Sequence, residues 1–340
     1  VFDGASFVLN GNGEMALQLP SWQEAVVITE WKRDGDIWCC LPGKCLAPDT
    51  GVAAIYQAMV LGLRDSVNIA GVPGVLLGLS GGMDSALSAA VAVDALGSDR
   101  VHCVMMPSPY TSKESLEDAS EAAAVMGIRY DTVSIKPAML AFDEMLSPLF
   151  ENLEADVTEE NIQARSRGLL LMSISNKFGH MLLTTGNKSE MAVGYSTLYG
   201  DMSGGYSVLQ DVYKTDVFKA CQWRNDNFSD TFFGPRGRVS PKRIISKPPS
   251  AELKPGQTDQ DTLPPYDELD DILVCLIEGE MGVNAIVSRG HQPETVQRVW
   301  RMLDVAEYKR RQAPPGVKIT SRAFGRDRRY PITNSFLNIL

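Results

Sequence analysis

The residues best suited to chemistry lie in one glycine-rich run, Gly78-Leu79-Ser80-Gly81-Gly82-Met83-Asp84-Ser85. An apolar stretch typical of a buried strand ends there, and a helical pattern begins at Asp84. Glycines let a backbone approach a ligand closely, and the N–H groups at a helix start bind anions, most often phosphate. The run has neither the lysine of a Walker A loop nor the spacing of a dinucleotide fingerprint. An ordinary tight turn with Asp84 and Ser85 as capping residues is the alternative for this run taken alone.

A second polar run, residues 184–201, opens where another apolar stretch ends. Its Glu190 and the earlier Asp84 could together hold Mg²⁺ against bound phosphates, because Mg²⁺ prefers oxygen ligands that it shares with a substrate. The alternative for Glu190 is a first-turn acid that stabilises the start of a helix. A phosphate loop expected at the same sheet edge favours the metal site.

Alternating helices and strands from about residue 50 must position both runs. Apolar spacing predicts helices over 52–70, 84–96, 159–178, 266–279, 281–290 and 293–311. Residues 111–114 fit a capping box before a further helix that ends at Gly127. Apolar runs predict strands over 75–79, 101–106, 130–135 and 181–184. Strands and helices in this alternation form a doubly wound parallel α/β sheet, in which ligands bind beyond the carboxyl ends of the strands.

Residues 1–45 are predicted to form short β pieces, with a hairpin turn at 10–13 and a strand over 25–28. This segment is too small to carry its own core.

Residues 226–265 are rich in glycine, proline and polar residues and are predicted to form a long loop, either a lid or a disordered segment. The chain opens at Val1 without a start methionine or a leader, so we expect a fragment of a longer protein with no signal peptide.

Composition narrows the class of protein. The 340 residues are 44% hydrophobic and 22% charged, which is typical of a soluble globular chain, and no apolar run approaches the ~18 residues of a membrane span. A net charge of −10 argues against nucleic-acid binding.

The six cysteines and three histidines lack zinc-site spacing, so we expect reduced thiols in the cytoplasm. The basic segment 309–329 is expected to pack against the acidic body, where 258–271 hold six acids and no base, or against a partner subunit.

Together the motifs resemble those of the NAD⁺ synthetase family. The glycine-rich run is similar to the pyrophosphate loop of the N-type ATP pyrophosphatases, which split ATP into AMP and pyrophosphate to adenylate a substrate. Further runs follow in the family's order at 159–165, 184–190, 194–201, 246–253 and 264–270. The resemblance covers residues 50 to about 330 and implies an adenine nucleotide alpha hydrolase-like domain over 50–340. Residues 1–45 resemble the end of the nitrilase-like glutaminase domain that precedes it in glutamine-dependent bacterial members.

The resemblance implies ATP-dependent amidation of deamido-NAD⁺ (nicotinic acid adenine dinucleotide), the last step of NAD⁺ biosynthesis. ATP would adenylate the nicotinate carboxylate and release pyrophosphate, and ammonia would then attack the acyl-adenylate to give NAD⁺ and AMP. In full-length members the ammonia comes from glutamine. The implied cofactor is Mg²⁺ with ATP as co-substrate, and the implied protein is a cytoplasmic homo-oligomer without nucleic-acid or membrane partners.

The matching family positions also imply individual roles. ATP would be bound by Gly78, Ser80, Gly81, Gly82, Asp84, Ser85, Thr185, Lys214 and Ser250. Deamido-NAD⁺ would be bound by Asn161, Arg165, Glu190, Tyr199, Asp201, Asp261 and Lys309. The metal ligands would be Asp84 and Glu190, and the catalytic residues Asp84, Lys214 and Asp201. Tyr195 and Tyr199 could stack on the pyridine ring, but a role as core tyrosines is the favoured alternative for both. Tyr308 stands where the family has a histidine, which departs from the pattern.

Two other classes share the glycine-rich loop. One is a different amidating or thiolating pyrophosphatase, such as a GMP synthetase-like or tRNA-modifying enzyme, and the other is a non-catalytic nucleotide-binding module. Residues 185–201 with Asn161 and Arg165 argue against the first class, and a tRNA enzyme would also need a basic face. Glu190 and Lys214 argue against the second, which would lack the second carboxylate and the lysine.

We predict that this chain uses free ammonia but not glutamine. The glutaminase nucleophile of the family is a cysteine with glutamate and lysine partners, and those motifs are absent from the printed sequence. Purified protein should form NAD⁺ with ammonium chloride as nitrogen donor and release no glutamate from glutamine. Measurable glutaminase activity in a pure sample would contradict the prediction.

Overall fold

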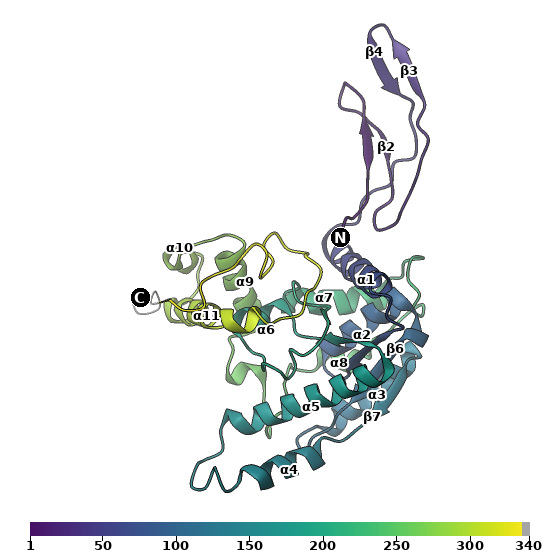
Figure 1. Ribbon diagram of the computed structural model, residues 1–340. Coiled ribbons are helices and arrows are strands. Elements are labelled where there is room, and N and C mark those ends of the chain that lie inside the picture. The colour runs from purple at the N-terminus through teal and green to yellow at the C-terminus, as the bar shows by residue number, and fades with distance from the viewer. Residues whose placement is uncertain (335–340) are drawn as a thin grey trace.

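The structure, a computed structural model, describes residues 1–334, so residues 335–340 of the predicted 50–340 domain lie outside the described part. Its centre is a five-stranded parallel sheet in the order β7-β6-β5-β8-β9. Strands β6 and β7 of this sheet are labelled in Figure 1. The strands are β5 (Val75–Gly78), β6 (Val101–Met105), β7 (Arg129–Thr132), β8 (Met181–Thr184) and β9 (Tyr206–Ser207). The predicted α/β class with a doubly wound parallel sheet is therefore confirmed.

Helices cover both faces of this sheet and continue into a separate helical cluster. Those around the sheet are α1 (Gly51–Ile69), α2 (Met83–Leu96), α3 (Lys113–Met126), α4 (Lys136–Leu146), α5 (Val157–Phe178), α7 (Lys214–Asp226) and α8 (Lys242–Ser246). The others are α6 (Lys188–Val193), α9 (Tyr266–Ile277), α10 (Val283–Val287), α11 (Pro293–Val305) and α12 (Glu307–Arg310).

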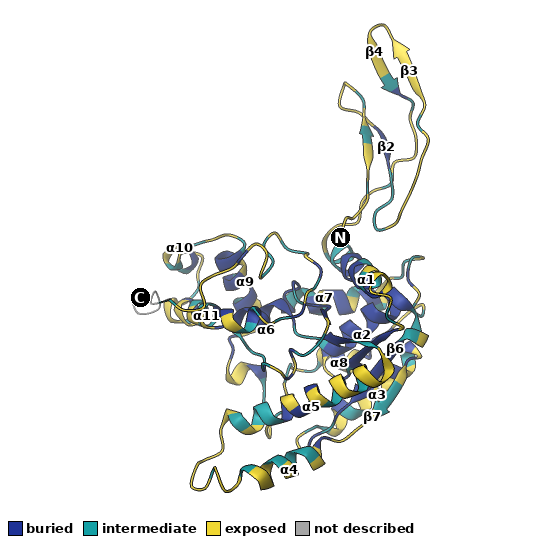
Figure 2. Ribbon diagram, viewed as in Figure 1, coloured by how far each residue is buried: buried dark blue, intermediate teal, exposed yellow. Residues whose placement is uncertain are grey.

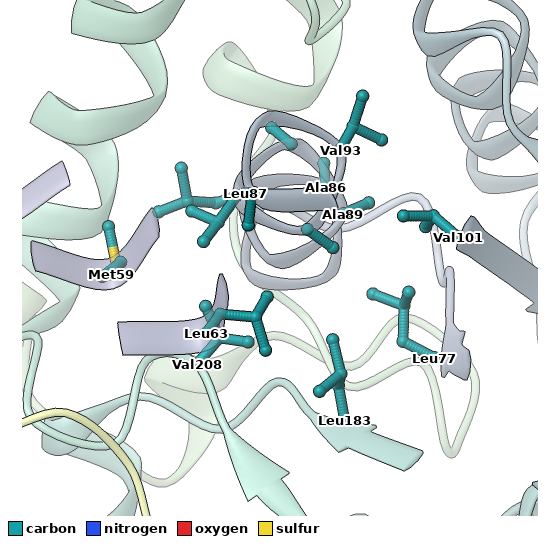
Figure 3. Packing of buried hydrophobic residues seen from close by; sticks show 14 of the residues in the cluster. Met59, Leu63, Leu77, Ala86, Leu87, Ala89, Val93, Val101, Leu183 and Val208 are labelled. Carbon is teal, nitrogen blue, oxygen red and sulfur yellow. The ribbon is translucent and has the colours of Figure 1, made fainter. Parts of the chain in front are cut away.

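The alternation of side chains along β5 explains why both faces are covered. Leu77 packs into the larger core with residues of α1, α2, α3 and α7, whereas Leu76 packs on the other face against α4 and α5. Figure 3 shows Leu77 and Leu183 of the sheet beside Ala89 of α2. Nearly every residue of α2 is buried, and its many alanines let the helix lie close to the strands. The glycine-rich run is thereby fixed between a central strand and a central helix.

The helical cluster forms a second apolar core. Residues of α6, α9, α10 and α11 meet there, with Leu269, Leu273 and Val299 fully buried. The cluster joins the sheet through α6 and α7, which start near the carboxyl end of β8 and after β9. The parallel sheet and the helical cluster therefore meet at the carboxyl edge of the sheet, where ligands are expected to bind.

Residues 1–45, here called the N-terminal arm, extend away from the body (Figure 1). Their strands form two antiparallel hairpins, β1 (Phe7–Leu9) with β2 (Met15–Gln18) and β3 (Trp31–Asp34) with β4 (Ile37–Cys40). The predicted turn at 10–13 is present. The predicted strand over 25–28 is wrong, because that apolar run has no neighbouring strand and is largely exposed (Figure 2). The hairpin lies just beyond it, around Gly35 with its positive φ of 59°.

The segment 226–265 is mostly irregular, as predicted, but it contains α8 and a short 3₁₀ turn, Asp259–Asp261. Arg243 in α8 donates to Asp118 at 2.6 Å, so the segment is tied to α3. The α3 cap also differs from the predicted capping box, since Ser112 rather than Thr111 accepts the hydrogen bond from the N–H of Ser115. Helices α4, α6 and α7 were not predicted.

Three further expectations concern the chain as a whole. Within residues 1–334, no helix is long and apolar enough to cross a membrane. All six cysteines are free thiols. The basic tail does pack on the acidic body, but its ion pairs within the described residues go to other acids than those of 258–271, for example Arg322 to Glu280 and Arg328 to Asp304.

A buried ion pair between α2 and α7 should contribute strongly to stability. Arg224 binds Asp94 through two nitrogens, at 2.5 and 3.0 Å, and both side chains are fully buried. We predict that Asp94→Asn lowers the free energy of unfolding by about 3–5 kcal/mol, because the guanidinium would remain buried without its charge partner. Urea denaturation measures the change.

The matched control is Asp230→Asn, which breaks the exposed pair with Arg236 and should leave the unfolding midpoint unchanged. Equal midpoints for wild type and Asp94→Asn would contradict the prediction.

Candidate active site

The glycine-rich run forms a tight loop between β5 and α2. Gly81 has a φ of +80°, and a Cβ there would collide with the backbone carbonyl of Ser115, so only glycine fits. Ser85 Oγ accepts a hydrogen bond from the N–H of Ser80 at 3.2 Å and donates to the carbonyl of Gly82 at 2.9 Å. Gly82 is the N-cap of α2 and no side chain caps the helix, so capping by Asp84 and Ser85 is not their role in this structure.

A cavity of about 1050 Å³ opens at the carboxyl edge of the sheet, in front of this loop. Most of the predicted site residues line it, although they come from distant parts of the chain. They are Gly78, Ser80, Gly81, Gly82, Asp84, Ser85, Asn161, Thr185, Glu190, Asp201, Lys214, Ser250 and Lys309.

Lys214 is the charged centre of this cavity. Its ammonium forms an ion pair with Asp84 and lies 3.8 Å from Glu190 Oε1, while its side chain is only 3% exposed. Asn187 donates from Nδ2 to Asp84 Oδ1 at 2.9 Å, and its own Oδ1 accepts from the N–H of Glu190 at 2.9 Å. Lys214 begins α7, which packs on the sheet, and Glu190 lies in α6 of the helical cluster, so both parts of the fold supply partners of the Asp84 loop.

The proximity of two carboxylates changes how protons are held. Burial and the neighbouring negative charge of Asp84 raise the pKa of Glu190 to about 8, although Lys214 opposes this rise. Burial alone would lower the pKa of Lys214, but the carboxylates of Asp84 and Glu190 raise it above its usual value. Lys214 therefore stays a cation, and Glu190 holds a proton more readily than an ordinary glutamate.

A second polar group lies where α5, the 194–201 loop and α12 meet. Asp201 accepts from the N–H of Thr197 at 2.8 Å, and burial raises the pKa of its carboxyl to about 6. Asn161 Oδ1 accepts from Thr197 Oγ1 at 2.9 Å. Lys309 donates to the carbonyls of Gly194 and Ser196 at 2.7 and 2.6 Å. These side chains hold the 194–201 loop in place.

Three predicted site residues do not line the cavity. Arg165 is exposed and donates to the carbonyl of Leu198 at 3.2 Å. Tyr199 is 67% exposed with a φ of +62°, so it is not a core tyrosine either. Asp261 closes its own 3₁₀ turn by accepting from the N–H of Thr258 at 2.9 Å. The acid of this turn that lines the cavity is Asp259, whose Oδ2 accepts from the hydroxyl of Tyr266 at 2.8 Å.

Sequence reasoning also missed several residues that line the cavity. Lys247 and Glu252 form an ion pair at 3.0 Å, and both bind the Ser112 and Ser115 hydroxyls at the start of α3. Arg167 lines the cavity from α5. Lys247 and Glu252 fall inside the run 246–253, so their position beside Ser250 was the available signal.

A phosphate-type loop facing two carboxylates and a lysine, at the carboxyl edge of a doubly wound sheet, defines a nucleotide-binding α/β protein. Residues 55–313 match the family model described as NAD synthase. The chain belongs to this family.

Relatives and solved structures agree with this assignment. The chain is 53% identical over 334 residues to a glutamine-dependent NAD(+) synthetase of Rhodobacter capsulatus, covering 98% of this chain and 60% of that protein. It resembles the glutamine-dependent NAD⁺ synthetase of Acinetobacter baumannii in complex with adenosine diphosphate, at 48% identity and a TM-score of 0.68, over 98% of this chain and 59% of that one. The NMN synthetase of Francisella tularensis is 27% identical, with a TM-score of 0.64, over 77% and 96%. The chain thus spans about three-fifths of the glutamine-dependent relatives that it matches.

The pKa of Glu190 predicts a pH dependence of stability. Between its usual value of 4.5 and about 8, the folded state holds a proton that the unfolded state has released. Stability from this group is therefore lost as the pH rises through that range, by at most about 1.4 kcal/mol per pH unit. We predict that Glu190→Gln removes this part of the slope in urea denaturation between pH 5 and 8.

Glu294→Gln, which changes an exposed glutamate, should leave the slope unchanged. Parallel stability curves for wild type and Glu190→Gln would show that Glu190 titrates normally.

Proposed function

We propose that this chain catalyses ATP-dependent amidation of deamido-NAD⁺ to NAD⁺ through an acyl-adenylate, with release of pyrophosphate and AMP. The observation that carries the proposal is the Asp84–Lys214–Glu190 cluster beside a glycine-rich loop, in a cavity with a second polar end at Asp201. Family membership and the names of the longer relatives support the substrate.

The loop end of the cavity suits a triphosphate. The backbone N–H groups of the loop and the start of α2 provide donors, and the hydroxyls of Ser80, Thr185 and Ser250 line the same space. Lys214 would offset negative charge as the carboxylate approaches the phosphates, because its ammonium is fixed and largely shielded from water. ATP is the matching co-substrate, and the ADP complex of the Acinetobacter baumannii enzyme supports an adenine nucleotide.

Asp84 and Glu190 would hold Mg²⁺. Two carboxylates share one lysine here, and burial together with the charge of Asp84 raises the pKa of Glu190, an effect that a bound divalent cation would offset. No group of three or more His, Cys, Asp or Glu in the described chain forms a ready metal site, so the ion would take its other ligands from phosphates and water. When bound, Mg²⁺ would neutralise developing charge on the phosphates.

The other end of the cavity would bind deamido-NAD⁺. Asn161, Asp201 and Lys309 line it and are held by contacts to the 194–201 loop. Asp201 would act as a catalytic group for the incoming ammonia, since burial raises the pKa of its carboxyl to about 6 and suits it to accept a proton near neutral pH. Arg165, Tyr199 and Asp261 stay outside this proposal because they do not line the cavity.

We also infer that the N-terminal arm, residues 1–45, is the end of a nitrilase-like glutaminase domain, followed by the synthetase domain from residue 50. Phe2, Val26 and Ile28 of the arm are 97%, 98% and 92% exposed, which is typical of surface that another domain covers. The greater length of the relatives supports such a domain. Glutamine would then supply the ammonia in the longer protein. A homo-oligomeric state and a cytoplasmic location stay predictions.

The direct test is an assay with ATP, Mg²⁺, ammonium chloride and deamido-NAD⁺ that quantifies NAD⁺, AMP and pyrophosphate. Equal amounts of the three products would support the proposal. Formation of NMN from nicotinic acid mononucleotide instead is the competing result, because a solved NMN synthetase shares the fold. ATP cleavage without either product would show that the acceptor is another carboxylate.

We predict that Asp84→Asn lowers the rate of pyrophosphate release by about 10²-fold or more, since it removes one charge from a preorganised site. The amide keeps the size of the side chain and Glu190 stays beside the buried Lys214, so the variant should fold, with a thermal midpoint lowered by less than in Asp94→Asn. Steady-state release of pyrophosphate and a thermal melt measure both quantities.

The matched control is Asp99→Asn, which changes an exposed residue of the short 3₁₀ turn before β6. This variant should release pyrophosphate at the wild-type rate. Near-normal turnover of Asp84→Asn would remove Asp84 from the proposed metal site.

A further inference from the structure

Arg167 lines the cavity from α5 and has few partners for a half-buried guanidinium. Its Nε donates to the backbone carbonyl of Met106, just beyond β6, at 3.1 Å. Among residues 1–334, no carboxylate forms an ion pair with it and no other acceptor takes its terminal nitrogens. A guanidinium carries five N–H donors, so four remain available in this position.

Two other arginines of the chain have most of their guanidinium donors taken by the protein, although Nε of Arg310 has no partner in the described chain. Arg224 donates to both oxygens of Asp94 and to three backbone carbonyls. Arg310 donates to Glu307 and to three backbone carbonyls. Both stabilise the fold with partners of the protein itself, whereas Arg167 leaves most of its donors for something else.

The charges near Arg167 do not fill this gap. Glu252 and Asp201 are the carboxylates that act on it electrostatically. Glu252 is held by Lys247, Ser112 and Ser115, and Asp201 accepts from the N–H of Thr197. Burial lowers the pKa of Arg167 to about 10, which still leaves it charged at neutral pH. Arg167 is therefore charged at neutral pH, and its terminal N–H donors have no acceptor among residues 1–334.

The same two neighbours locate Arg167 within the cavity. Glu252 belongs to the 246–253 run that contains Ser250, at the end proposed for ATP. Asp201 belongs to the end proposed for deamido-NAD⁺. Arg167 lines the cavity that contains both ends, and its charge acts on a carboxylate of each end.

We propose that Arg167 binds anionic oxygen atoms of the reactants with its terminal guanidinium nitrogens, at the junction where the carboxylate meets the phosphate to be attacked. This inference rests on the proposed function and adds to it a binding residue that family positions did not supply. Guanidinium groups suit this task because their fork geometry matches two oxygens of a carboxylate or a phosphate. The anion is either a phosphate of ATP or an acidic group of deamido-NAD⁺.

The test titrates ATP with Mg²⁺, and separately deamido-NAD⁺, into wild type, Arg167→Gln and Arg167→Lys by calorimetry. We expect Arg167→Gln to weaken binding of at least one reactant by about tenfold or more, since a charge-assisted hydrogen bond is lost. Arg167→Lys should be intermediate, because it keeps the charge but not the fork. Weakened binding of ATP alone assigns the phosphate, and weakened binding of deamido-NAD⁺ alone assigns the acidic group of that substrate.

Lys177→Gln is the matched control, because it removes one positive charge from the exposed side of the same helix and should bind both reactants as the wild type does. Thermal melts of the variants exclude unfolding, and Arg167→Lys keeps the test valid if Arg167→Gln does not fold. Wild-type affinity for both reactants in both Arg167 variants would overturn this inference and leave the proposed function intact. A wild-type protein that binds neither reactant would overturn both.

Discussion

The ion pair between Lys214 and Asp84 joins α7 to the glycine-rich loop at the start of α2, at the point where the helical cluster meets the sheet. Asp84 stands at the start of α2, which the sheet fixes, and Lys214 stands at the start of α7, whose backbone is tied to the helical cluster. The N–H of Lys214 donates to Ser189 Oγ at 2.9 Å, and the N–H of Thr215 donates to Asp270 at 2.8 Å. Ser189 also donates to Asp270, so α6, α7 and α9 are fixed together. The position of the lysine ammonium is therefore determined by the whole fold.

This arrangement explains how a chain of net charge −10 can form a site for anions. The cations that line its cavity each have a distinct set of partners; they are Lys214, Lys247, Lys254, Lys309 and Arg167. The four lysines are engaged by carboxylates, hydroxyls or carbonyls of the protein. Such fixed charges and dipoles need little reorganisation when a ligand brings its own charge. The local field, rather than the overall charge, decides what the cavity can bind.

The sequence allowed the central part of the fold to be predicted. Strands 75–79, 101–106 and 181–184 were clear because most of their residues are apolar, and the loop after Gly78 followed from its glycines. Helices α6 and α7 escaped because α6 has only six residues and α7 has hardly any apolar periodicity. The strand expected at 25–28 failed because apolar character alone cannot show whether a neighbouring strand exists.

How well a site residue could be predicted from the sequence differed from one residue to the next. Asp84, Glu190 and Lys214 come together because each stands at or near the start of a helix next to the sheet edge. Asp261 could not be told from Asp259 in an acidic stretch, since a 3₁₀ turn places one toward the cavity and the other at its own cap. Arg167 was not predicted, because a sequence does not show which hydrogen-bond acceptors a guanidinium lacks in the folded chain.

The central claim is that this site activates a carboxylate by adenylation, and isotope transfer tests it most directly. Deamido-NAD⁺ labelled with ¹⁸O in its nicotinate carboxylate would be incubated with the protein, ATP, Mg²⁺ and ammonium chloride. One carboxylate oxygen stays with the phosphorus when ammonia displaces AMP, so mass spectrometry should find one ¹⁸O atom per AMP formed. Label in inorganic phosphate with ADP as product, or AMP without label, would contradict an acyl-adenylate.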